Sequence, residues 1–394
     1  MMSRWLCAVV ATIAVSVGAQ AREPVVIGEV RRLRSSILNE DRTYEVHLPR
    51  GYEVSGERYP VLFVLDGQSH FTHVVGSASY LMDQGEIPPL IVVGLRSTVR
   101  VRDFTPTDWP RAWVGGGGAA KFRAFLAREL IPEVERSFRT DGFRIVSGHS
   151  ASGQFALYCL ESEPALFQAY FALSPSLDWD DNLPIRGLEQ AFDEKPNLQA
   201  FAFVARSDDR GRALADFDRL VEVFQKKAPP GLRWRSQAYD LETHGSIALV
   251  GTIDALRALY AGWRVPEGLA DEGLPAVEAY FAELSKTFGR TVPLTEGVVN
   301  ELAYQALEKK QTQEALALFR RNVAAHPGSA DAFDGLADAL VADGQLEAAV
   351  GAETTCVRLA RQTSHPQLAT FEKRLERMKA AATSSKRASP AAKP

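Results

Sequence analysis

The chain has 394 residues, of which 46% are hydrophobic and 24% charged, with a formal net charge of −4 at pH 7 and a pI near 6.1. This composition is ordinary for a soluble globular protein, and the length leaves room for one large and one small domain. The slight acidity gives no global reason to expect nucleic acid binding, and no cysteine or histidine cluster has the spacing of a zinc site.

The first 21 residues have the three parts of a secretory signal in order. Arg4 precedes a twelve-residue apolar run, Leu6–Val17, and Ala19–Ala21 reads as a small-x-small cleavage site. The apolar run is too short to span a membrane. We therefore expect residues 1–21 to be removed and the mature protein to be periplasmic or secreted, with no membrane span.

Apolar runs and helical patterns then alternate along residues 22–266. The predicted strands are Val25–Leu33, Thr43–Leu48, Val61–Leu65, Ile91–Leu95, Arg144–Ser147, Phe201–Ala205 and Trp234–Tyr239. The predicted helices are Ala119–Ser137, Gly153–Glu161, Arg212–Lys227 and Ser246–Trp263. Alternation of this kind predicts an open, mostly parallel sheet with helices on both faces, whose ligands bind at the carboxyl ends of the strands.

Residues 267–381 contain helical patterns only, with an internal repeat. Residue types recur 34 positions apart at Leu302-Ala303 and Leu336-Ala337, at Gln311 and Gln345, and at Ala315 and Ala349. This is the period of tetratricopeptide helix pairs; a generic pair of helical hairpins is the alternative. We expect units at Asn300–Pro327 and Asp334–Ala360, a capping helix at Gln367–Ala381, and a disordered tail at residues 382–394.

The most informative stretch surrounds Ser150. The apolar run Phe143–Val146 leads to Gly148, Ser150 follows on a tight turn, and the apolar segment Phe155–Leu160 leads away. A strand, a sharp turn and a helix with serine at the apex is the nucleophile elbow of α/β-hydrolases. The second glycine usual in that motif is Ser152 here, a small residue that we expect the close packing to tolerate.

A nucleophilic serine needs a base and an orienting acid, which follow it in the chain order Ser, acid, His. Only three histidines follow Ser150, and His326 and His365 fall in the helical repeat region, which leaves His244 as the base. The acid is expected after the strand Phe201–Ala205.

Asp208 is the first choice for the triad acid and Asp209 the second, because both follow that strand directly. Asp240 and Glu242 are less favoured alternatives, close in sequence to His244. A favourable charge at the start of a helix is the simpler interpretation of the paired aspartates.

Two backbone N–H groups are expected to bind the oxyanion: that of Ala151, after the nucleophile, and that of Gln68, in the turn after an earlier strand. A loop with three arginines, including Arg96 and Arg100, also follows a strand end. These arginines are candidates for contacts with an anionic substrate, although ion pairs in a solvated loop are the favoured interpretation.

The chain resembles the putative esterase family, which includes esterase D-like enzymes and the enterochelin and bacillibactin esterases. The resemblance covers about Val25–Trp263 and lies in ordered blocks, among them LDGQSHF, RVRDFTP, GHSASGQFALY, YFALSPSLDWDDN and THGS. It implies an α/β-hydrolase fold, a Ser150, Asp208 and His244 triad, and oxyanion donors at Gln68 and Ala151. Many members have an aromatic pair where this chain has Leu177-Asp178-Trp179, so Trp179 is a candidate substrate contact.

The sequence therefore predicts an exported carboxylic ester hydrolase that forms an acyl-enzyme on a small-molecule ester and requires no metal or organic cofactor. Transfer of the acyl group to another acceptor is one alternative. The other is an inactive hydrolase-fold scaffold whose helical repeats bind a partner protein. The two cysteines of the mature chain, Cys159 and Cys356, are expected to be buried free thiols.

Overall fold

The computed structural model describes residues 24–110 and 115–388, so the predicted signal peptide lies outside the described residues. An eight-stranded sheet has the order β1-β2-β4-β3-β5-β6-β7-β8. The strands are β1 (Glu29–Ser35), β2 (Glu40–His47), β3 (Tyr59–Leu65), β4 (Ile91–Leu95), β5 (Thr140–His149), β6 (Ala169–Leu173), β7 (Ala200–Arg206) and β8 (Leu232–Ala238). Strands β3 to β8 run parallel to one another, and β2 pairs antiparallel with both β1 and β4, which confirms the predicted mostly parallel sheet.

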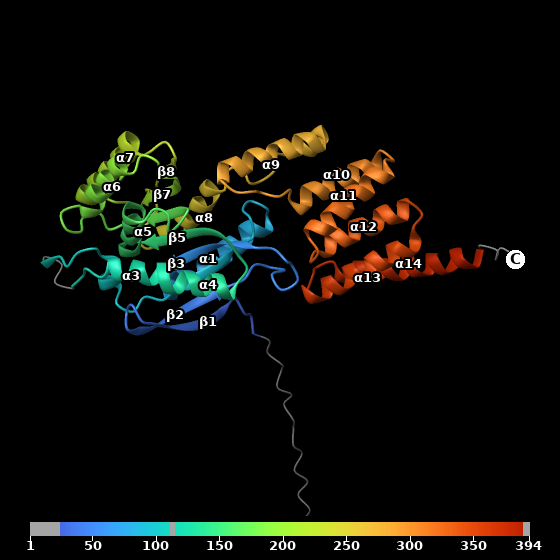
Figure 1. Ribbon diagram of the computed structural model, residues 1–394, viewed down its shortest axis with the longest axis horizontal. Helices are drawn as coiled ribbons and strands as arrows, with labels where there is room; N and C mark the ends of the chain where they lie inside the picture. The colour runs from blue at the N-terminus through green and yellow to red at the C-terminus, as the bar shows by residue number, and fades with distance from the viewer. Residues whose placement is uncertain (1–23, 111–114, 389–394) are drawn as a thin grey trace, which may run out of the picture.

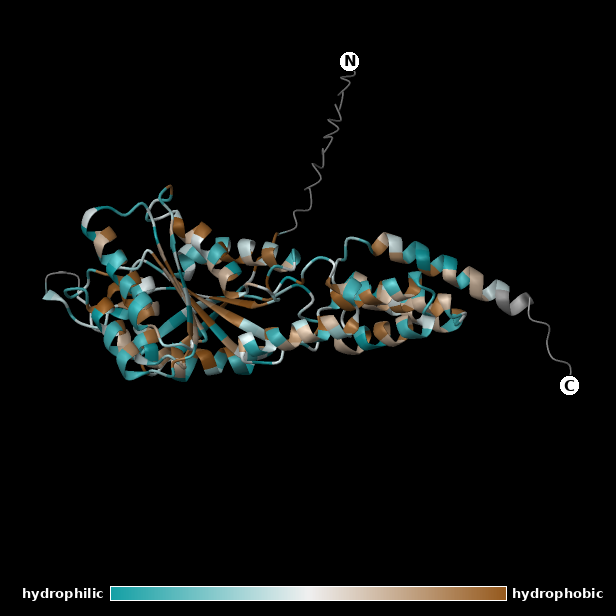
Figure 2. Cartoon of the chain, turned by 90° about the horizontal axis from the view of Figure 1, so that it is seen from above, coloured by the Kyte–Doolittle hydropathy of each residue, from teal (hydrophilic) through white to brown (hydrophobic). Residues whose placement is uncertain are grey.

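Helices cover both faces of the sheet, as alternating side chains of β3 require. Leu62 and Val64 face one apolar core with α1 and α8, whereas Val61 and Phe63 face a second core with α3 to α7. The helices are α1 (Gly67–Asp83), α2 (Arg100–Phe104), α3 (Ala119–Phe125), the π-helix η2 (Leu126–Leu130), α4 (Ile131–Ser137), α5 (Ala151–Ser162), α6 (Leu183–Glu194), α7 (Gly211–Lys227) and α8 (Ile247–Leu259). Figure 2 shows the apolar strands at the centre of this layered module.

The C-terminal region is entirely helical, as predicted. It contains the 3₁₀ helix η3 (Leu269–Glu272), α9 (Leu274–Phe288), α10 (Glu296–Glu308), α11 (Thr312–Ala325), α12 (Ala330–Ala342), α13 (Leu346–Gln362) and α14 (Leu368–Ala388). The starts of α10 and α12, and of α11 and α13, are separated by 34 residues, the period found in the sequence. These helices stack to one side of the sheet module (Figure 1).

Helix α14 corrects the predicted boundary of the disordered tail. Residues 382–388 continue the helix, and only residues 389–394 of the predicted tail lie outside the described part. The physical reason is composition, because alanine, lysine and arginine are strong helix formers and the stretch follows directly on a helix. None of the helices among the described residues is long and apolar enough to cross a membrane.

The two parts of the molecule share one apolar core. The cluster that contains Leu62 and Phe171 from the sheet continues through Phe281 of α9 to Leu316 and Phe319 of α11. Among the described residues, Cys159 and Cys356 are buried free thiols, as expected. The helical region is therefore packed against the sheet module and is not a tethered appendage.

His326 makes a polar contact across this junction. Its Nδ1 lies 2.8 Å from Oε1 of Glu57, a residue between β2 and β3. Burial alone would lower the pKa of His326, but the hydrogen bond and charge of Glu57, with the charge of Glu296, raise it above the ordinary 6.5. The protonated imidazole is therefore favoured in the folded state.

We expect this contact to stabilise the fold at low pH. A raised folded-state pKa contributes stability that is present below about pH 6.5 and is lost as the pH rises through the folded value. The stability advantage of wild type over His326→Gln in urea unfolding should therefore shrink by about 0.5–1 kcal/mol between about pH 6 and pH 8. Parallel pH dependences of the two proteins would contradict this assignment.

Candidate active site

Ser150 stands on a sharp turn between β5 and α5. Its backbone has φ 62° and ψ −121°, in the left-handed half of φ space that non-glycine residues rarely adopt. A Cβ at Gly148 would collide with the backbone carbonyl of Ser152, and one at Gly153 would lie 3.1 Å from the carbonyl oxygen of Gly148. Close backbone approach thus requires glycine at 148 and leaves little room for a side chain at 153, and the turn has the geometry of a nucleophile elbow.

The two expected oxyanion donors lie at adjacent helix N-termini. Gln68 is in the first turn of α1, directly after β3, and Ala151 is the first residue of α5, directly after β5. Strands β3 and β5 are neighbours and parallel, so both helices start at the same edge of the sheet. The first N–H groups of a helix have no partner within it and are available to an anion.

A pocket of about 270 Å³ opens beside Ser150. Its lining consists of Ser150, Ser174, Pro175, Ser176, Leu177, Asp178, Asp209, Arg212, Ala213, Asp216, Phe217 and His244. The structure therefore brings the predicted nucleophile and the predicted base to one cavity. In the described residues their side chains share no hydrogen bond, as is common in enzymes without bound substrate.

Of the two aspartates expected as the triad acid after β7, the one that lines this pocket is Asp209, the second choice from the sequence. Asp208 is exposed and absent from the lining, and its backbone N–H donates to the carbonyl of Glu242 at 2.9 Å. Asp209 is partly buried, and the hydroxyl of Ser207 donates to its Oδ1 at 3.2 Å. The pocket lining thus favours Asp209 over Asp208 as the partner of His244.

Asp66 is a buried residue of the site that has no catalytic role in the sequence-based prediction. It is 3% exposed, follows β3, and has φ 55°. Its carboxylate accepts hydrogen bonds from Oγ of Ser97 at 2.6 Å, Nε of Arg100 at 2.9 Å, and Oγ of Ser152 at 2.7 Å. The serine that replaces the usual elbow glycine therefore ties the elbow to the start of α1.

The arginines of the loop after β4 are held in ion pairs, as the favoured interpretation expected. Arg96 lies 2.6 Å from Glu45, and Arg100 binds Asp66 and the carbonyl of His149 at 3.0 Å. Neither lines the pocket. These contacts position the loop, so the structure gives no support to Arg96 and Arg100 as substrate contacts.

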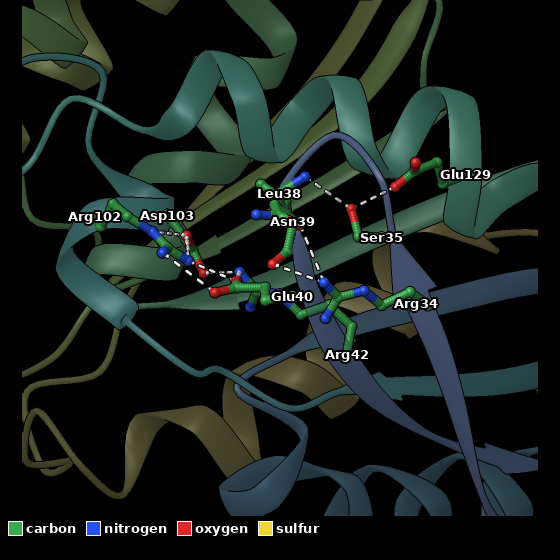
Figure 3. A network of polar contacts seen from close by, with 9 residues as sticks. All are labelled: Arg34, Ser35, Leu38, Asn39, Glu40, Arg42, Arg102, Asp103 and Glu129. Carbon is green, nitrogen blue, oxygen red and sulfur yellow. Dashed lines mark hydrogen bonds and ion pairs between the residues drawn. The ribbon is translucent and has the colours of Figure 1, made fainter.

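Further contacts fix α2, which carries this arginine-rich segment. Arg102 pairs with Glu40 at 2.7 Å, and the fully buried Arg42 pairs with Asp103 at 2.6 Å (Figure 3). These pairs connect the short helix to the start of β2. The RVRDF block is thereby anchored on one side to β2 and on the other, through Arg100, to the active-site edge.

Trp179 is also placed away from the pocket lining. It is 8% exposed, its Nε1–H donates to the hydroxyl of Thr107 at 3.1 Å, and its ring packs 5.4 Å from that of Trp109. Leu177 and Asp178, just before it, line the pocket instead. Trp179 is therefore a buried residue next in sequence to the pocket-lining residues Leu177 and Asp178 and does not line the pocket itself.

We expect Asp66→Asn to destabilise the fold. Asparagine tolerates the left-handed backbone of this position, but it removes the negative charge that pairs with Arg100. Its amide NH₂ would also replace an acceptor oxygen and face the donating groups of Ser97, Arg100 and Ser152. The free energy of unfolding in urea should fall by about 2–3 kcal/mol. Asp83→Asn, at the exposed far end of α1, is the matched control. A loss below about 0.5 kcal/mol would show that the network contributes little.

Comparison with known proteins identifies the family of the chain. The model of the putative esterase family matches residues 35–221. A ferri-bacillibactin esterase from Bacillus subtilis (strain 168) is 35% identical over 256 residues, which cover 58% of this chain and 88% of that protein. The chain belongs to the putative esterase family. It is accordingly an ester hydrolase with a mostly parallel α/β sheet.

Solved structures extend the likeness beyond the sheet. An IroE-like serine hydrolase from Shewanella oneidensis has a TM-score of 0.66 and 28% identity, and the match covers 74% of this chain and 97% of that one. An uncharacterised protein from Capnocytophaga ochracea has a TM-score of 0.59 at 16% identity and covers 90% of this chain and 99% of that one. The second likeness concerns the fold alone, and its coverage shows that the fold of the helical region is shared as well.

Proposed function

We propose that this esterase is an exported serine hydrolase that cleaves siderophore-type carboxylic esters through a Ser150–His244–Asp209 triad. The observation that carries the proposal is the strained elbow of Ser150 opening onto a pocket that His244 and Asp209 also line. Asp209 replaces Asp208 in the sequence-based triad because Asp208 is absent from that lining.

The mechanism follows from these positions. His244 takes the proton of the Ser150 hydroxyl as its oxygen attacks the ester carbonyl, and Asp209 holds the imidazole and stabilises its charge. The N–H groups of Gln68 and Ala151 donate to the oxyanion. Collapse of the tetrahedral intermediate expels the alcohol, which takes the proton from His244. Water then hydrolyses the acyl-enzyme with His244 again as base.

The substrate class is inferred from the relatives. The Bacillus subtilis relative is named for its action on ferri-bacillibactin, and an Aspergillus fumigatus relative, 30% identical over 133 residues, for its action on triacetylfusarinine C. We extend to this chain the feature common to both names, an ester of a siderophore. Export is supported by Arg4, the apolar run Leu6–Val17 and the small residues at Ala19–Ala21.

The test is labelling of the purified mature protein with a fluorophosphonate probe, followed by an ester panel. The panel compares short acyl esters with a catecholate siderophore lactone and a hydroxamate siderophore ester, each with and without iron. Labelling together with a higher kcat/KM on a siderophore ester supports the proposal. Activity confined to short acyl esters would refute the substrate class, and absence of both labelling and turnover would refute the mechanism.

A further inference from the structure

Four histidines lie in series beside the nucleophile, on three different segments. His70 and His73 belong to α1, His149 ends β5 directly before Ser150, and His244 lies between β8 and α8. Nδ1 of His70 is 3.0 Å from Nε2 of His73. The ring centroids of His70 and His149 are 5.5 Å apart, and those of His149 and His244 are 4.7 Å apart. The row thus extends from α1, which carries the expected oxyanion donor Gln68, past the elbow to the proposed base His244.

The contact between His149 and His244 is directional. Nε2 of His149 is hydrogen-bonded to the backbone carbonyl oxygen of His244. A carbonyl only accepts, so Nε2 carries the proton and donates it. Burial lowers the pKa of His149 to about 4, with a further lowering from the neighbouring charges of His244, His70 and Arg100. The ring is therefore neutral near pH 7, and the neutral Nε2–H tautomer is the one this bond selects.

The segment that carries His244 needs such a constraint. His244 itself is exposed. The hydrogen bonds nearby in its loop join other residues: the N–H of Thr243 donates to the hydroxyl of Ser246, and the N–H of Asp208 donates to the carbonyl of Glu242. Among the described residues, the bond from His149 is the one the structure gives to the backbone of His244. Loss of that donor leaves the main chain at the base without a fixed partner.

We propose that His149 is a positioning residue that holds the backbone of His244, so that the imidazole of His244 faces Ser150. The inference rests on the proposed triad mechanism. The effect on catalysis follows from geometry, since a displacement of about 1 Å of a catalytic group can cost about 100-fold in rate. Substrate binding is affected less, because His149 does not line the pocket beside Ser150.

Three substitutions separate the hydrogen bond from the bulk of the ring. His149→Ala removes both, His149→Phe keeps a ring without a donor, and His149→Gln places an amide N–H near the position of Nε2. On a short acyl ester, we expect kcat to fall about 10- to 100-fold in the alanine and phenylalanine variants, with KM within about threefold of wild type. The glutamine variant should recover kcat to within about threefold.

The control is His73→Gln, which removes the ring at the end of the row that is farthest from His244; its kcat should stay within about twofold. Thermal unfolding of every variant identifies any that fail to fold. Wild-type kcat in His149→Ala, or recovery by phenylalanine but not by glutamine, would overturn the positioning role while the esterase mechanism stands. A wild-type protein that neither hydrolyses esters nor takes the probe would overturn the mechanism and this inference with it.

Discussion

Ser150→Ala should lower kcat on a short acyl ester by at least about four orders of magnitude and abolish fluorophosphonate labelling. Without the hydroxyl no acyl-enzyme forms, and what remains is the small acceleration from binding and the oxyanion donors. The fold should be unaffected, because alanine loses only one oxygen and meets the same backbone strain at this position. Steady-state kinetics, probe labelling and thermal unfolding measure the three quantities.

Ser162→Ala is the matched control, since Ser162 is the last residue of α5, the helix that follows Ser150, and its hydroxyl donates to the carbonyl of Tyr158. Its kinetics should equal those of wild type. Activity of Ser150→Ala within about tenfold of wild type would exclude a serine nucleophile at the elbow. A contaminating serine esterase would also give residual ester hydrolysis, but the fluorophosphonate probe would inhibit it. The residual activity of the variant must therefore also be shown to resist the probe.

The elbow was predictable from sequence because its determinants are local. The apolar run of β5, the small residues at Gly148 and Gly153, and the helix that follows are adjacent in the chain, and backbone sterics alone restrict what can stand there. The same holds for β3, β4 and β7, whose continuous apolar runs are typical of strands buried on both faces. Local signals were therefore sufficient to predict these strands and the elbow.

Helix α1 and strand β6 were not predicted, for different reasons. Helix α1 begins with a turn-like sequence, and Gly67 is needed there because a Cβ would lie 2.6 Å from the backbone of Gly94, a contact invisible in sequence. Its glycine, serine and threonine residues are weak helix formers that packing must overcome. Strand β6 is as short and as buried as β4, but its sequence AYFAL has no β-branched residue to distinguish a strand from a buried helical segment. The helix α6 was missed as well.

The partners of the loop arginines were also beyond sequence reasoning. Glu45 and Asp66, which neutralise Arg96 and Arg100, come from β2 and the end of β3, and only the sheet order brings them beside the loop. In the sequence, the three arginines of this loop are consistent with an anion-binding site. In the folded protein they form ion pairs that fix α2 and the edge of the sheet that carries Ser150.

The choice between Asp208 and Asp209 depends on the turn after β7, where adjacent residues point in different directions. We expect Asp209→Asn to lower kcat by about 10²- to 10⁴-fold, because in the proposed triad this carboxylate fixes the tautomer of His244 and stabilises its charge. Asp208→Asn, one residue away with the same chemistry and an exposed side chain, should retain kcat within about threefold. Steady-state kinetics on a short acyl ester compare the two variants directly.

The contrast between these two variants is itself the measurement, since they differ in one position and not in charge. A large loss in Asp208→Asn with little change in Asp209→Asn would return the acid to the first choice from the sequence and mean that the loop rearranges when substrate binds. Equal, small losses in both would show that His244 works without either of these two carboxylates. In that case the bond from His149 to the backbone of His244 would be the main constraint on the base.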